Sequence, residues 1–95
     1  MQTNIVWTKH AENRQKQWER KLGITRGEVE AVLNNAEQVL PGDMNVRVAQ
    51  ARKHGGILRV PFVEEKGRRK VITVYWTSKV EKYWKEKYCE DSIRF

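Results

Sequence analysis

The chain has two histidines, and one of them is spaced to act together with an arginine. His10 and Arg14 are four residues apart, which places them one turn apart on the same side of a helix. An imidazole exchanges protons near neutral pH, and a guanidinium binds phosphate oxygens with a fixed geometry. The pair is therefore a candidate for chemistry at a phosphate. The alternative is that both residues flank the core, with His10 capping a strand end and Arg14 lying along Trp18.

A second group of basic residues falls where we expect strands and tight turns. Residues that project from adjacent strands or stand at the turns between them can form a strip that contacts phosphates. This group is Arg47, Arg52, Arg59, Arg68, Arg69 and Lys70. His54 stands at the tip of the expected hairpin, where loop residues often bind ligands. Basic side chains scattered over a solvated surface are the alternative, and a solvated turn is the alternative for His54.

Two aromatic residues, Tyr75 and Trp76, end the last expected strand close to these cations. Aromatic rings beside positive charges suit the stacking of an unpaired base. Aromatic residues in a buried strand more often belong to the core, and both readings stay open.

The helices that must position His10 are indicated by periodic apolar residues. A first helix is predicted from about Thr8 to Leu22, and Gly23 ends it. The residues 25–28, Thr-Arg-Gly-Glu, have the spacing of a capping box and start a second helix. A third helix is predicted from Ser78 to about Cys89, followed by a flexible tail over residues 90–95.

Three strands are predicted over residues 45–52, 57–64 and 70–76, after a turn at residues 40–43. Short turns at Gly55-Gly56 and at residues 66–68 imply an antiparallel meander. Pro61 cannot donate a hydrogen bond within a sheet, so we expect a bulge or exposure there. Residues 71–76 are expected to be the central strand. The fold class expected is α+β, with two N-terminal helices, an antiparallel β-meander, a C-terminal helix and a short edge strand at residues 4–7.

Composition limits the classes of function. With 95 residues the chain is expected to be a single domain over 1–95. The net charge of +7 favours an anionic partner such as nucleic acid, an acidic protein or an anionic membrane. One cysteine, Cys89, allows no internal disulfide and no zinc motif, so no metal or cofactor is expected. No apolar run is long enough for a membrane span, and we expect a cytoplasmic protein.

Three short motifs in this order resemble the RelE/ParE toxin superfamily, and most of all its uncharacterised BrnT-like branch. They are His10-Ala-Glu-Asn-Arg14, Leu22-Gly23-Ile24-Thr25, and Val71-Ile72-Thr73-Val74-Tyr75. The resemblance spans about residues 7–84. It implies a ribonuclease toxin, active without metal, which an acidic antitoxin holds silent.

On this resemblance His10 and Arg14 match the His-x-x-x-Arg element of the family and are the predicted catalytic pair. Cleavage without metal needs a base, an acid and cations around the phosphate. The predicted RNA-binding residues are Arg47, Arg52, His54, Arg59, Arg69 and Tyr75. The sequence lacks a clear catalytic tyrosine or histidine after the last strand. The alternatives are a non-catalytic module of the same fold that binds nucleic acid or protein, and a structural subunit that pairs through a sheet edge.

Overall fold

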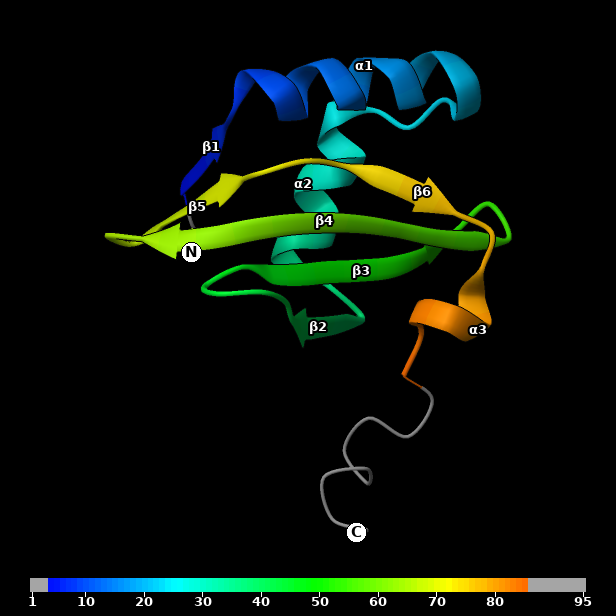
Figure 1. Cartoon of the computed structure of the whole chain (residues 1–95). Coiled ribbons are helices and arrows are strands. Elements are labelled where there is room, and N and C mark those ends of the chain that lie inside the picture. Colours follow the sequence, from blue (N-terminus) through cyan, green and yellow to red (C-terminus); the bar gives the residue numbers. More distant parts are fainter. Residues whose placement is uncertain (1–3, 86–95) are drawn as a thin grey trace, which may run out of the picture.

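The computed structural model describes residues 4–85 and shows a mixed α+β fold, in which one sheet carries helices on both sides (Figure 1). The elements in chain order are β1 (Asn4–Trp7), α1 (Lys9–Leu22), α2 (Arg26–Asn34), β2 (Gln38–Pro41), β3 (Arg47–Lys53), β4 (Gly56–Glu65), β5 (Arg68–Val71), β6 (Tyr75–Thr77) and α3 (Val80–Tyr83).

The six-stranded sheet has the order β1-β5-β4-β3-β2, and β6 pairs with β4 beyond the end of β5. Only β1 and β5 among these neighbours run parallel, and the other pairs are antiparallel. A parallel pair needs a long connection, which the chain from α1 to β4 supplies. In the strand order given above, β4 is the central strand, and not the segment of residues 71–76 as predicted.

The predicted architecture of two N-terminal helices, an antiparallel meander and a C-terminal helix is wrong. The first strand, β1, lies at one edge of the sheet and pairs in parallel with β5, so the sheet is not an antiparallel meander. Residues 38–41 form the strand β2, although turn residues begin in this segment. The predicted strand of residues 70–76 is two strands, β5 and β6.

The break between β5 and β6 lies opposite Pro61. Phe62 pairs with Val71, and Arg59 pairs with Tyr75. The two β4 residues are three positions apart, whereas their partners in the facing chain are four positions apart. One extra residue in a facing strand is a β-bulge. The carbonyl of Pro61 accepts a hydrogen bond from the amide of Ile72 at 2.9 Å, so the amide that proline lacks would also have faced this strand. The bulge that was expected at Pro61 therefore lies in the facing segment between β5 and β6, and not in β4 itself.

Both N-terminal helices begin with side-chain caps. The hydroxyl of Thr8 accepts from the amide of Ala11 at 3.1 Å. The capping box predicted between Thr25 and Glu28 is confirmed, since each side chain accepts from the backbone amide of the other residue. Gly23 ends α1 with a left-handed φ of 71°. Of the predicted third helix, four residues form α3; Cys89 and the tail lie outside the described residues.

The core lies between the sheet and the helices α1 and α2. Its members come from both helices, from the loop between them, from three strands and from the segment after β5: Ala11, Ile24, Val29, Val32, Leu33, Ala49, Leu58, Val60, Phe62, Val71 and Val74. Successive side chains of a strand alternate between the two faces. The neighbours of these core residues in the strands therefore face the other side, which we call the open face. No helix among residues 4–85 is long and apolar enough to cross a membrane.

Candidate nucleic-acid interface

The alternation of side chains divides the predicted RNA-binding residues between the two sides of the sheet. Arg47 pairs with Phe62 of the core, and Arg69 lies two residues before Val71, so both belong to the helix side. Arg59 pairs with Gln50 and with Tyr75, and all three belong to the open face. The single strip that the sequence suggested is therefore two separate sets.

The two arginines on the helix side are engaged in structural contacts. Arg47 and Arg69 both approach the carboxylate of Glu64, each at 3.7 Å. Arg69 also donates to the backbone carbonyl of Leu33 at the end of α2, and its guanidinium lies 5.5 Å from the ring of Phe62. Arg69 thus joins the sheet to α2, and its positive charge is partly balanced by Glu64.

The predicted catalytic pair lies on α1, on the helix side of the sheet. His10 is exposed in the first turn of the helix, and Arg14 donates to Gln17 at 3.2 Å. The structure does not bring either residue to Arg59, because the sheet stands between them. His54 is exposed at the turn between β3 and β4, with a φ of 51°.

The open face contains a connected group of polar side chains around Arg59, which we call the Arg59 cluster (Gln38, Gln50, Arg59, Tyr75 and Tyr83). Arg59 is 8% exposed and Gln50 is fully buried. The guanidinium donates from Nε to Gln50 Oε1 at 2.8 Å and from Nη1 to the hydroxyl of Tyr75. Gln50 in turn donates to Gln38 Oε1 at 2.8 Å. Four strands, β2, β3, β4 and β6, contribute one residue each.

The charge of Arg59 has no acidic partner in the described part of the chain. None of the ion pairs among residues 4–85 includes Arg59, and its contacts are an amide, a phenol and two aromatic rings. The guanidinium carbon lies 4.2 Å from the ring centre of Tyr83 and 5.5 Å from that of Tyr75. Burying a cation without a counter-charge is costly. A guanidinium without a carboxylate partner among the described residues can bind an anion such as a phosphate group.

Three residues of the Arg59 cluster, Gln38, Gln50 and Tyr83, were not predicted as site residues from the sequence. A usable signal for Gln50 existed in the hairpin turn. The turn residues are His54 and Gly55, both with positive φ, and a two-residue turn there pairs Gln50 with Arg59. Nothing in the local sequence indicates Gln38, because its strand was not predicted.

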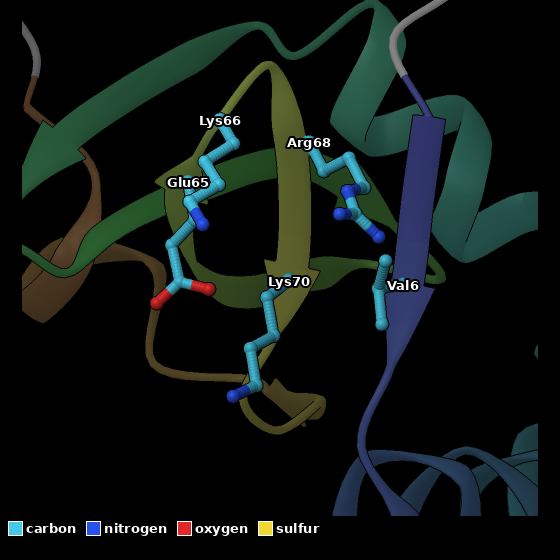
Figure 2. Close-up of a pocket in the computed structure, with 5 residues that line it drawn as sticks. All are labelled: Val6, Glu65, Lys66, Arg68 and Lys70. Atoms are coloured by element: carbon cyan, nitrogen blue, oxygen red, sulfur yellow. The ribbon is translucent and has the colours of Figure 1, made fainter.

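The open face continues into a shallow pocket of about 640 Å³ beside the β4–β5 hairpin, lined by Val6, Glu65, Lys66, Arg68 and Lys70 (Figure 2). Three cations and one carboxylate line it, so it is electropositive. Lys70 pairs with Val63, four residues along β4 from Arg59, which is roughly 13 Å at the rise of a β-strand. We call this pocket the basic pocket.

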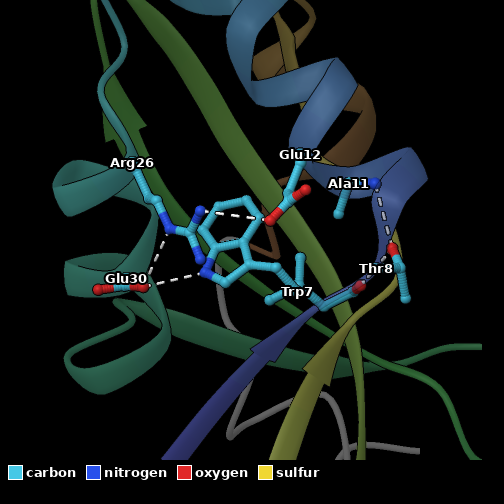
Figure 3. Close-up of polar contacts among 7 residues, drawn as sticks. Trp7, Thr8, Ala11, Glu12, Arg26 and Glu30 are labelled. Carbon is cyan, nitrogen blue, oxygen red and sulfur yellow. Dashed lines mark hydrogen bonds and ion pairs between the residues drawn. The ribbon is translucent and has the colours of Figure 1, made fainter.

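The strand β1, whose Val6 lines the basic pocket, is held in place by contacts around Trp7 that involve residues of α1 and α2 (Figure 3). Trp7 donates from its indole to Glu30 at 2.9 Å, and the guanidinium of Arg26 lies 4.5 Å from the Trp7 ring. Arg26 also pairs with Glu30 at 3.6 Å and with Glu12 of α1 at 3.5 Å. Each of these contacts adds only modestly to the free energy of unfolding, because the charged groups are partly exposed to solvent. Together they tie β1, α1 and α2 to one another.

One carboxylate on the helix side has a shifted titration. Lys53 donates to Glu28, and this bond, followed by the bond from the Thr25 amide, holds the pKa of Glu28 below its ordinary value. The positive charge of His54 adds a smaller effect in the same direction. The pair joins the end of β3 to the start of α2.

No group of three or more metal-binding side chains occurs within residues 4–85. Comparisons with protein-family models, with curated proteins and with solved structures gave no match to this chain.

Proposed function

We propose that the open face of the sheet binds single-stranded RNA through Gln50, Arg59 and Tyr75 and through the basic pocket. The observation that carries this proposal is the buried charge of Arg59, which meets Gln50 and Tyr75 but no carboxylate of residues 4–85. A phosphate would place a negative charge beside this guanidinium. The basic pocket provides further cations for the next part of the same backbone.

Two features favour RNA over other polyanions. Tyr75 borders Arg59 with an aromatic ring, and the pairing of cations with aromatic rings suits unpaired bases. The resemblance to the RelE/ParE superfamily also points to RNA. In this proposal the protein works in the cytoplasm, and an acidic antitoxin-like protein would compete for the same positive surface.

The test is binding of a labelled single-stranded RNA of about ten nucleotides, measured by fluorescence anisotropy over a range of salt concentrations. The variant Arg68→Gln with Lys70→Gln should bind several-fold more weakly. The slope of log K against log salt should fall by about 0.7 for each phosphate that the variant no longer neutralises. A charge-matched control, Lys16→Gln with Arg20→Gln, changes exposed residues of α1 and should bind nearly as the wild type. Equal weakening in the two variants would refute a specific role for the open face.

A second candidate function is metal-independent cleavage of the bound RNA. The favouring observation is the bond between Arg59 and the Tyr75 hydroxyl, because a phenol held beside a guanidinium can exchange a proton at a phosphate. His10 with Arg14 is the competing catalytic pair. Induced expression of wild type, Tyr75→Phe and His10→Ala, with mapping of new RNA 5′ ends, separates these cases. New ends that vanish only in one variant identify the acting group, and no new ends from folded wild type leave binding alone.

A further inference from the structure

The end of the described chain lies over the Arg59 cluster and is held there by its main chain. Gln50 donates to the carbonyl of Tyr83 at 3.1 Å, and Gln38 donates to the carbonyl of Lys85 at 2.7 Å. The amide of Lys85 donates back to Gln38 Oε1 at 3.2 Å. Side-chain amides of two sheet residues therefore bind the main chain of the segment of residues 80–85, at Tyr83 and at Lys85. We call this segment the strap.

The side chains of the strap cover cations of the open face. The ring of Tyr83 lies 4.2 Å from the Arg59 guanidinium and meets Tyr75 edge to face at 6.4 Å. The ring of Trp84 lies 4.6 Å from the guanidinium of Arg52. An aromatic ring over a guanidinium is also the position that an RNA base would take on the same arginine. The strap thus occupies the stacking surface of the proposed RNA site.

The strap is attached less firmly than the rest of the fold. Its helix, α3, has four residues, contains no buried residue and lacks a side-chain cap at Lys79. In contrast, α1 and α2 each bury residues in the core. An element held by a few hydrogen bonds and ring contacts opens at a lower free energy than an element that buries apolar surface. We therefore expect the strap to open at a lower free energy than α1 or α2.

We propose that the strap is a displaceable cover that competes with RNA for Arg59 and Arg52. This inference rests on the proposed function and adds its regulation. With the strap closed, Arg59 is buried and the basic pocket alone receives RNA. With the strap open, Gln50, Arg59 and Tyr75 become accessible, and the binding surface extends along β4. Apparent affinity for RNA is then set by the fraction of molecules in which the strap is open.

The test uses the full chain with Tyr83→Ala and Trp84→Ala together, and Tyr83→Phe as the matched control that keeps a ring over Arg59. Removing both rings should tighten RNA binding by about fourfold or more, since each of the two cation–π contacts contributes a factor of roughly two to thirty, the larger value when it is desolvated. Tyr83→Phe should bind as the wild type. Weaker or unchanged binding by the double variant would overturn the proposal.

Hydrogen exchange in the wild type gives a second measurement that does not depend on the folding of a variant. The amide of Trp84 donates to the carbonyl of Val80 at 2.8 Å, and that of Lys85 donates to Gln38. RNA should speed the exchange of both amides. Binding of RNA with slowed or unchanged exchange would refute competition while leaving the proposed function intact. No binding by the wild type or by the double variant would remove both.

Discussion

Two adjacent glycines at the β3–β4 hairpin should respond very differently to the same substitution. Gly56 is the first residue of β4 and lies against β6: a Cβ there would be 2.3 Å from the carbonyl oxygen of Thr77 and 2.6 Å from the Trp76 ring. Gly55 is a turn residue with a φ of 76°, and a Cβ there meets nothing within 4 Å. The first position is limited by space and the second by backbone conformation.

The expected magnitudes follow from these two causes. Gly55→Ala places a Cβ on a left-handed residue, which costs about 1–2 kcal/mol. Gly56→Ala overpacks a site whose nearest neighbour is backbone and cannot turn away, so we expect a destabilisation of about 3 kcal/mol or more. Against a total stability of about 5–14 kcal/mol for a chain of this size, the second effect is severe.

The measurement is urea unfolding followed by tryptophan fluorescence. With a slope of about 1.5 kcal/mol per molar urea, the midpoint should fall by about 1 M for Gly55→Ala and by about 2 M or more for Gly56→Ala. The Gly56 variant should also bind RNA more weakly, because displacing β6 moves Tyr75 away from Arg59. Equal stability of the two variants, or greater stability of Gly56→Ala, would refute the packing explanation.

Three further changes have defined outcomes in the same unfolding assay. Thr25→Ala removes the capping hydroxyl of α2 and should cost about 1 kcal/mol, whereas Thr25→Ser should cost little; equal destabilisation by both would argue against the cap. Trp7→Phe removes the hydrogen bond to Glu30 and should cost about 1–2 kcal/mol, and unchanged stability would mean that this bond contributes nothing. The pKa of Glu28 is lowered in the folded protein. The charged carboxylate therefore stabilises the fold at pH values above the pKa of Glu28 in the unfolded chain, and this stabilisation is lost as the pH falls through the pKa of the folded state. Stability of Glu28→Gln should therefore fall less steeply than that of the wild type below about pH 5, and parallel curves would contradict the assignment.

Sequence reasoning located the starts of α1 and α2 because their causes are local. A threonine with a glutamate three residues later satisfies free amides wherever the rest of the chain goes, and this occurs at Thr25 and Glu28. The left-handed glycine at Gly23 ends α1 for an equally local reason. The strand-rich middle of the chain was also visible, although its turn was placed one residue late. With Gly55-Gly56 as the turn, Arg59 would have faced Arg52, and like charges directly opposite each other are unfavourable.

The candidate site was less accessible to sequence reasoning, because the residues that compose it come from four strands and the strap. Arg59 and Tyr75 were selected from the sequence as RNA-binding candidates, and the structure brings them together. Arg47 and Arg69 were selected for the same reasons but lie on the other side of the sheet. The choice of side depends on strand register, and a shift of one residue exchanges the faces.

The sequence by itself determined the caps of α1 and α2, the apolar periods of these helices and the excess of positive charge, since each depends on residues close in the chain or on composition alone. Only the tertiary structure decided the parallel pairing of β1 with β5, the bulge opposite Pro61, and the placement of the strap over Arg59. These three features depend on contacts between distant segments. Their energies come from pairing and packing that no local pattern encodes.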